Sequence, residues 1–275
     1  MILRRRTIVL WQLGIAISLI LSILALNLYF HSTPLQTNAA LRNLAPSLNH
    51  LFGTDGLGRD MFVRTIKGLY FSLQVGLLGA LMGVILATVF GVLAGLGNSI
   101  IDKIIALAWL VDLFIGMPHL IFMILISFVV GKGAQGVIIA TAVTHWPSLA
   151  RLIRNEVYHL KNKEFVQLSK SMGKTPYYIV RHHILPLIAS QIFIGFILLF
   201  PHVILHEASM TFLGFGLSAE QPSVGIILSE AAKHISLGNW WLVIFPGLYL
   251  ILVVNAFDTI GESLKKLFYP QTDHF

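Results

Sequence analysis

Long apolar stretches dominate the chain and alternate with shorter polar segments. A helix needs about 20 apolar residues to cross the hydrocarbon core of a bilayer. Six stretches approach or exceed this length, and they are Ile8–Phe30, Gly68–Leu96, Ile104–Val130, Gly136–Ile153, Leu187–Phe212 and Trp241–Gly261. The fourth is short and contains Pro147. The pattern predicts an all-α, polytopic membrane protein with six transmembrane helices.

Two of these stretches carry further information. The first follows Arg4, Arg5 and Arg6, as in a secretory signal peptide. Its apolar run exceeds the roughly 7–15 residues of such peptides, and no small-x-small cleavage site follows, so we expect a retained span. The second contains the pairs Gly79–Gly83 and Gly91–Gly95. Glycines four residues apart let helices approach closely in lipid.

Composition supports this class. Of the 275 residues, 56% are hydrophobic and 11% are charged, whereas a soluble domain carries about 25% charged residues. A net charge of +7 would suggest nucleic acid in a soluble protein. In a membrane protein, excess Lys and Arg mark the cytoplasmic ends of spans instead, so we expect no nucleic-acid partner. The absence of cysteine excludes disulfides and thiolate metal sites, and any metal would be bound by His, Met, Asp or Glu.

The distribution of Lys and Arg predicts the orientation. With the N-terminus in the cytoplasm, 13 basic residues lie inside: Arg4, Arg5, Arg6, Lys103, Arg151, Arg154, Lys161, Lys163, Lys170, Lys174, Arg181, Lys265 and Lys266. Six lie outside: Arg42, Arg59, Arg64, Lys67, Lys132 and Lys233. The excess on the inner side is the direction that the positive-inside rule requires. We therefore predict both termini and residues 155–186 in the cytoplasm, with 31–67 and 213–240 outside.

Two long loops organise the chain. The first span and the outer loop form an N-terminal unit, residues 1–67, and this loop contains the glycine-rich segment Phe52–Asp60. Residues 68–275 form a core of five spans, which includes the basic cytoplasmic loop 155–186.

The cytoplasmic loop has the pattern of two short helices joined by a turn. The first runs from Glu164 to Gly173, where glycine readily adopts a left-handed backbone. Thr175 is a typical N-cap and Pro176 a typical first helical residue, and we expect Pro186 to end the second helix. Such a helix–turn–helix suits docking into a groove of another protein. The alternative is an ordinary connecting loop.

This loop resembles the coupling loop of permeases in binding-protein-dependent ABC importers. An acidic–aromatic pair, Glu164-Phe165, precedes Gly173 by nine residues, and Ile184-Leu185-Pro186 ends thirteen residues after that glycine. Gln167-Leu168-Ser169 replaces the Glu-Ala-Ala usual in the motif. The resemblance implies that the loop contacts ATPase subunits, and the residues that it assigns to this contact are Glu164, Gln167, Gly173, Lys174, Thr175, Ile184 and Pro186.

Other segments resemble the peptide and nickel branch of the same family. They are Gly53-Thr54-Asp55, Gly58-Arg59-Asp60, Arg64, Thr211–Gly214 and Phe245-Pro246-Gly247. The resemblance implies the type I ABC importer permease fold in the cytoplasmic membrane. It also implies a heterodimer with a homologous permease, two ATPase subunits and an extracytoplasmic substrate-binding protein.

We expect ATP and Mg²⁺ to bind to the partner ATPases, and this chain to bind no cofactor. The segment Gly173-Lys174-Thr175 resembles the end of a P-loop, but that motif requires glycine at position 168, where this chain has Leu168. No catalytic set is present, so we expect a transport subunit and no enzyme. A channel or secondary carrier would not need the basic cytoplasmic helix pair, and carriers often show inverted repeats, which we do not find.

The fifth stretch bears on the cargo. His202, His206 and Met210 are spaced four residues apart, share one side of a helix, and could bind a transition metal transiently. The alternative is that the histidines are hydrogen-bonded within the bundle. The residues that we expect along the translocation path are His202, His206, Glu207, Met210, His145 and Asp112. Other polar residues in the spans, His119 among them, are expected to have structural roles.

The resemblance leaves two cargo classes, because this branch carries peptides or nickel and related metals. The pattern His202-x-x-x-His206-x-x-x-Met210 and the pair His145-Trp146 resemble nickel permeases, whereas Glu207-Ala208 resembles peptide permeases. The expected cargo is therefore nickel or a related metal, free or chelated, with dipeptides and oligopeptides as the alternative.

Overall fold

The computed structural model describes residues 2–97, 116–218 and 220–268. Within these ranges the regular structure is helical, apart from an isolated bridge between Thr54 and Asp60. The longer helices are α1 (Ile2–Tyr29), α2 (Met61–Leu96), α5 (His119–Val130), α6 (Ala134–Lys161), α9 (Leu185–Phe212) and α11 (Trp241–Phe268). The shorter ones are η1 (Ala39–Leu41), α7 (Glu164–Ser171), α8 (Pro176–Ile179), η2 (Val180–Ile184), α10 (Val224–Ala232) and η3 (Ile235–Leu237). The predicted all-α class is confirmed.

Five segments of the described chain are long and apolar enough to cross a membrane. They are Thr7–Tyr29, Met61–Leu96, Ala134–Lys161, Pro176–Phe212 and Trp241–Phe268, and they match the first, second, fourth, fifth and sixth predicted spans. The third predicted span, Ile104–Val130, lies partly outside the described residues. Its described part forms α5, an apolar helix of 12 residues.

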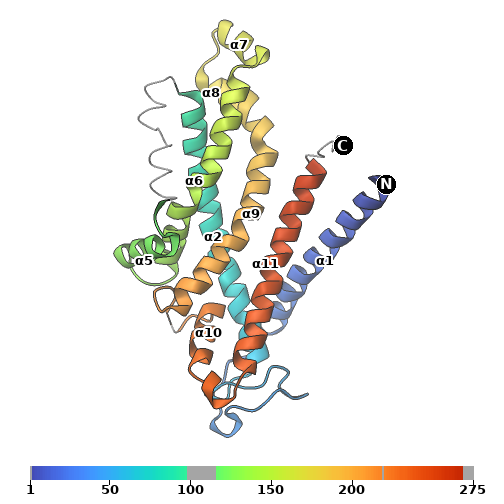
Figure 1. The fold of residues 1–275 in the computed structure, drawn as a ribbon, viewed down its shortest axis with the longest axis vertical. Helices are drawn as coiled ribbons and strands as arrows, with labels where there is room; N and C mark the ends of the chain where they lie inside the picture. Colours follow the sequence, from blue (N-terminus) through green and yellow to red (C-terminus); the bar gives the residue numbers. More distant parts are fainter. Residues whose placement is uncertain (1, 98–115, 219, 269–275) are drawn as a thin grey trace.

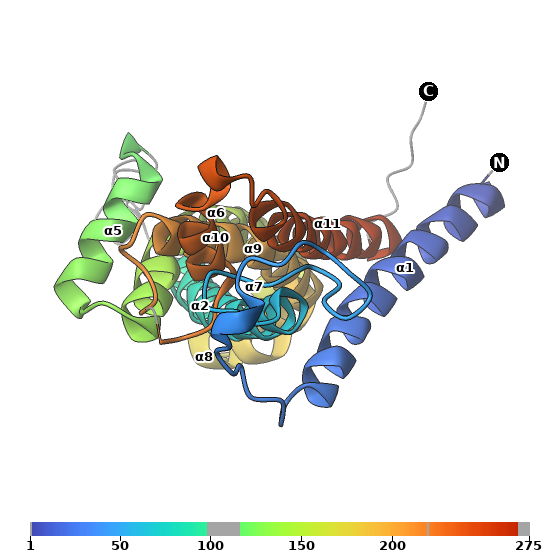
Figure 2. The same ribbon diagram turned by 90° about the horizontal axis from the view of Figure 1, so that it is seen from below.

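The long helices form a bundle. Figure 1 shows α2, α6, α9 and α11 extended along the long axis, with α7 and α8 at one end and the segment before α2 at the other. The start of α1 and the end of α11 point toward the α7 end. Seen from below, α1 and α5 lie on opposite sides of the central helices (Figure 2). Apolar clusters fill the space between α2, α6 and α9 near α7, and between α1, α2, α9 and α11 elsewhere.

Small residues allow α2 and α6 to pack closely. A Cβ atom on Gly91 would lie 2.8 Å from the carbonyl oxygen of Ala150, and one on Gly95 would lie 2.6 Å from Cβ of Val157. A larger residue at either position would push the helices apart, so the predicted close approach at this pair is confirmed. At Gly83 the nearest atom would be 3.5 Å away, which is an ordinary contact.

The prediction that Pro186 ends a helix is wrong. Helix continues from Pro176 to Phe212, and Pro186 lies in the first turn of α9. The reason is the π-helical turn η2, in which the backbone N–H of Leu185 donates to the carbonyl of Val180, five residues back. This wider turn accommodates a proline, which has no N–H to donate to the usual i−4 carbonyl.

Candidate functional site

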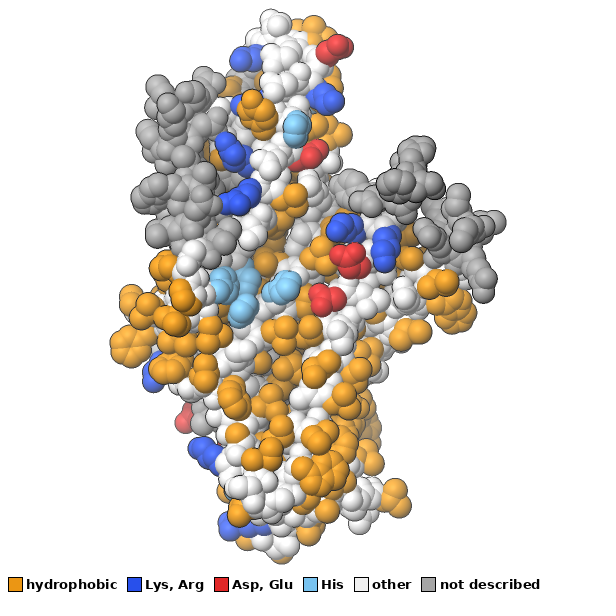
Figure 3. Space-filling model, in the orientation of Figure 1, with side chains coloured by type: hydrophobic (Ala, Val, Ile, Leu, Met, Phe, Trp, Pro, Cys, Tyr) orange, Lys and Arg blue, Asp and Glu red, His pale blue; other side chains and the backbone are white. Residues whose placement is uncertain are grey.

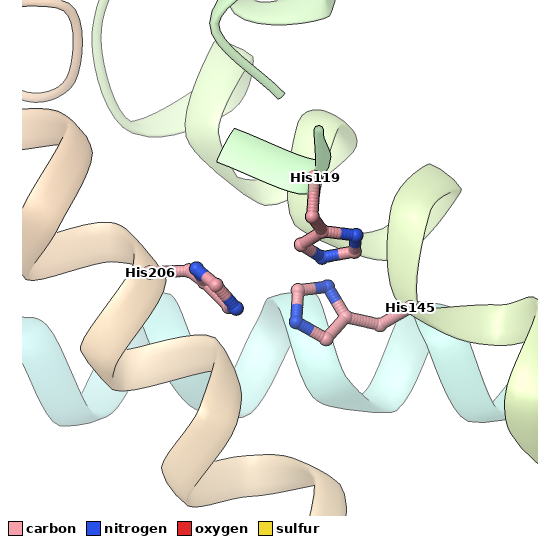
Figure 4. A group of neighbouring side chains, drawn as sticks. All are labelled: His119, His145 and His206. Carbon is pink, nitrogen blue, oxygen red and sulfur yellow. The ribbon is translucent and has the colours of Figure 1, made fainter. Parts of the chain in front are cut away.

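Three histidines from three helices meet near the middle of the bundle. His119 is the first residue of α5, His145 lies within α6 and His206 within α9. Each offers one ring nitrogen, and these three atoms all lie within 4.8 Å of one another. The ring centroids are 4.6 to 5.1 Å apart, and Figure 4 shows the rings turned toward a common point. Figure 3 shows histidines gathered at mid-height on one face of the molecule.

His145 is the buried member of this three-histidine group. Its Nδ1 lies 2.9 Å from the carbonyl oxygen of Thr141, one turn earlier on α6. A carbonyl can only accept, so Nδ1 carries the hydrogen and Nε2 carries the free lone pair. Nε2 is buried and has no hydrogen-bond partner among the described residues. His119 and His206 are each partly exposed.

The three residues that the sequence placed on one metal-binding side of α9 have different surroundings in the structure. Only His206 joins the three-histidine group. His202 is exposed, and Met210 is fully buried in an apolar cluster with Val75, Met123, Val137, Ala140 and Leu217. The helical period says which residues share a side of one helix, but not which neighbouring helix covers each of them. Here α5 and α6 cover Met210 with apolar side chains and bring His119 and His145 to His206.

The remaining predicted path residues have different surroundings. Glu207 is fully buried, and the hydroxyl of Thr211 donates to its Oε1 at 3.0 Å. Its Oε2 has no hydrogen-bond partner among the described residues. Thr211 packs against Gly225 of α10, and Glu207 is not a member of the three-histidine group. Asp112 lies outside the described residues.

His119 is the member that sequence reasoning missed, since we assigned it a structural role. One signal was available: ionisable side chains at membrane depth are rare and are functional candidates by default. His119 and His145 both lie in apolar stretches. No spacing rule links them to His206, because their meeting depends on how α5, α6 and α9 pack.

The helix–turn–helix predicted for the cytoplasmic loop is present. Gly173 has φ +77, in the left-handed region. The Thr175 hydroxyl accepts from the backbone N–H of Tyr178 at 3.3 Å, which makes Thr175 the N-cap of α8. Glu164 begins α7, and Gln167 donates from Nε2 to the carbonyl of Lys161 at 2.8 Å.

The tip of this helix pair presents apolar side chains to its surroundings. Its exposed large apolar residues are Phe165, Leu168, Met172 and Tyr177. The ammonium group of Lys174 lies 4.9 Å from the ring centre of Tyr178. Ile184 is fully buried and anchors the pair to the bundle core, while Pro186 is exposed. A projecting polar helix pair with an apolar tip has the character of a protein-binding surface.

At the opposite end, a network of ion pairs connects the segment before α2 to α10. The Arg64 guanidinium bonds Asp55 at 3.0 Å and Glu230 at 2.6 Å, and the Arg59 guanidinium bonds the same two carboxylates at 2.7 and 3.1 Å. Burial raises the pKa of Asp55, but hydrogen bonds from Arg59 and the backbone of Leu57 outweigh this and hold that pKa below its ordinary value. Asp60 caps α2 by accepting from two of its backbone N–H groups. The segment before α2 is therefore a structured cover at this end.

Known proteins resemble the chain over most of its length. Residues 87–270 match the family described as binding-protein-dependent transport system inner membrane component. A dipeptide transport system permease of Bacillus subtilis is 35% identical over 84% of this chain and 71% of its own length. The corresponding dipeptide permease of Alkalihalophilus pseudofirmus is 34% identical over 98% and 88%, and an oligopeptide permease of Bacillus subtilis is 30% identical over 98% and 88%.

One solved structure supports the fold. The inward-facing MetNI methionine ABC transporter contains a chain that aligns with a TM-score of 0.60 at 18% identity, covering 75% of this chain and 97% of the other. Together with the helical bundle, this alignment identifies the type I importer fold. The chain therefore belongs to the binding-protein-dependent transport system inner membrane component family, as a non-enzymatic permease subunit of an ABC importer.

Proposed function

We propose that this permease subunit imports short peptides. The observation that carries the proposal is the set of dipeptide and oligopeptide permeases that are 30–35% identical over 84–98% of the chain. These relatives do not support nickel, the cargo that the histidine pattern on α9 predicted. Met210 is buried in an apolar cluster and His202 is not a member of the three-histidine group, which removes part of the basis for that prediction.

The test is uptake by whole cells with and without this subunit. A labelled dipeptide and radioactive nickel are offered separately to a deletion strain and to the same strain carrying the gene. We expect dipeptide uptake to disappear on deletion and to return with the gene. Nickel uptake that depends on the subunit, together with unchanged dipeptide uptake, would contradict the proposal.

A second candidate, import of a transition metal or its chelate, is favoured by one observation. The three-histidine group brings three potential ligands together in the bundle. The nickel arm of the uptake measurement tests this candidate directly.

We also propose the assembly in which the chain works. The tip of α7 and α8 contacts one of two ATPase subunits, which bind ATP and Mg²⁺. A homologous permease completes the membrane part, and an extracytoplasmic binding protein delivers the cargo. Support comes from the exposed apolar tip of the helix pair and from the family to which the chain belongs. Purification of the tagged chain from membranes should yield the ATPases in stoichiometric amounts, and their consistent absence would refute this assembly.

A further inference from the structure

We propose that His119, His145 and His206 form a binding site for one divalent transition-metal ion. The site is assembled by three helices, α5, α6 and α9, and is not a local sequence motif. This inference concerns binding by the permease itself and stands whether the imported cargo is a peptide or a metal.

The spacing of the nitrogens is close to what a metal requires. Metal–imidazole bonds are about 2.0–2.1 Å long, which places two nitrogens of a tetrahedral site about 3.3 Å apart. The three nitrogens lie within 4.8 Å of one another, so closing the site needs movements of about 1.5 Å or less. His119 and His206 are partly exposed and can make such movements by rotating their rings.

His145 is already held as a ligand. Histidines that bind metals almost always donate their other ring N–H to a carboxylate, carbonyl or water, which fixes the tautomer and the ring orientation. Nδ1 of His145 makes this bond to the Thr141 carbonyl at 2.9 Å. Its Nε2 is left without a partner in a residue that is 8% exposed. A buried polar atom without a partner is costly, and a bound metal would satisfy it.

The alternative is a structural role, in which the three histidines hydrogen-bond one another and bind no metal. Among the described residues, the three rings contact each other at tilted or edge-on angles, and no hydrogen bond joins them. A hydrogen-bonded trio would not leave Nε2 of His145 without a partner. Metal binding therefore accounts for an observation that mutual hydrogen bonding does not.

The donor set selects the class of metal. Three neutral imidazoles suit Ni²⁺, Cu²⁺, Zn²⁺ and Co²⁺, whereas Mg²⁺ and Ca²⁺ require oxygen ligands. The nearby acid Glu207 lies outside the group, with Thr211 as its neighbour. Three protein ligands leave a fourth position open, as in sites that exchange ligands, whereas closed structural sites use four. The partly exposed His119 and His206 leave that position reachable, so we expect an exchangeable ion.

The test is equilibrium binding of NiCl₂ or CoCl₂ to the purified importer complex, prepared without a polyhistidine tag. We expect one saturable site per copy of this chain, with the visible absorption of Co²⁺ reporting nitrogen ligation. His119→Leu, His145→Leu and His206→Leu should each weaken binding at least tenfold. If the buried His145→Leu variant fails to assemble, the loss of metal affinity in His119→Leu and His206→Leu still tests the proposal.

Two controls use exposed histidines outside the three-histidine group. His159 lies near the end of α6, and His182 lies in η2 before α9. His159→Leu and His182→Leu should each change the affinity less than twofold. Absence of saturable binding to the wild-type complex, or binding that survives His119→Leu combined with His206→Leu, would overturn the proposal. Because no transport is measured, such a failure is separate from a failure of the peptide proposal.

Discussion

The backbone conformation at position 173 favours glycine, whereas the surrounding atoms would leave room for a side chain. Its φ of +77 is unfavourable for residues with a side chain, and a Cβ there would meet no atom within 4 Å. The cost of substitution therefore comes from the left-handed conformation alone, about 1–2 kcal/mol for an ordinary residue. The glycine allows the chain to reverse between α7 and α8, so that both helices reach the apolar tip.

Gly173→Val should therefore impair the coupling element while leaving the membrane bundle intact. We expect reduced recovery of ATPase subunits with the tagged chain and a loss of transport of at least fivefold, whereas Gly173→Asn should retain more of both, because Asn tolerates this conformation. Gly214→Val is the matched control: its glycine has φ +85 and the same open surroundings beyond the end of α9. Equal loss of ATPase recovery in both valine variants would mean that the α7–α8 turn has no special role.

Asp55 stabilises the outer end by compensating two guanidinium groups. Asp55→Asn leaves the buried Arg64 with Glu230 alone, and we expect a loss of about 3 kcal/mol, seen as a lower unfolding temperature of the purified complex. Glu230→Gln should cost less, because the Glu230 side chain is 38% exposed. A smaller effect of Asp55→Asn than of Glu230→Gln would contradict this ranking.

The pH dependence of this contribution follows from the lowered pKa of Asp55. An acid whose folded-state pKa lies below its unfolded value of 3.8 contributes stability above that value and loses it as the pH falls through the lowered pKa. Acidification of the outside medium to about pH 5 should therefore leave the ion-pair network intact. The difference in unfolding temperature between the wild-type complex and Asp55→Asn should therefore stay constant between pH 7 and pH 5.

At the scale of elements, the sequence predicted those features that depend on neighbouring residues alone, namely helix length, the turn and the helix cap. Apolar length located five membrane helices, and glycine and threonine located the turn at Gly173 and the cap at Thr175. Pro186 misled us because a π-helical turn, formed with no distinct sequence signal, carries the helix through it. The histidine site was only partly foreseen, since His206 and His145 meet His119 through tertiary packing. Periodicity along one helix contains no information on its neighbours.

The close contact of α2 and α6 can be tested with one methyl group. Gly91→Ala should destabilise the bundle, because its Cβ would lie 2.8 Å from the Ala150 carbonyl, and a backbone atom can move only with its helix. Gly83→Ala, on the same helix, places its Cβ 3.5 Å from the nearest atom and should be tolerated. We expect lower yield of folded complex for the first variant in detergent gel filtration. Equal yields would show that the helices can separate at little cost.

The whole molecule has two distinct ends. One end carries the projecting α7–α8 pair, and the start of α1 and the end of α11 point toward it; the other end carries the segment before α2, η3 and α10 (Figure 1). In the predicted topology, 13 Lys and Arg residues lie on the membrane side of the first end and 6 lie on the side of the second. The start of α1 and the end of α11 point toward the same end as the helix pair (Figure 1), which agrees with a chain that crosses the membrane an even number of times.

We predict that the α7–α8 end lies in the cytoplasm. The chain has no native cysteine, so a single introduced cysteine can be labelled from outside without background. Asn49, Lys163 and Ser236 are all exposed, and they lie in the outer loop, directly before α7, and in η3. In intact cells, a membrane-impermeant maleimide should label Asn49→Cys and Ser236→Cys but not Lys163→Cys. Permeabilisation should make Lys163→Cys reactive, which would show that the absence of labelling in intact cells reflects its location and not burial. Labelling of Lys163→Cys alone in intact cells would reverse the orientation and would place the helix pair beyond the reach of any cytoplasmic ATPase.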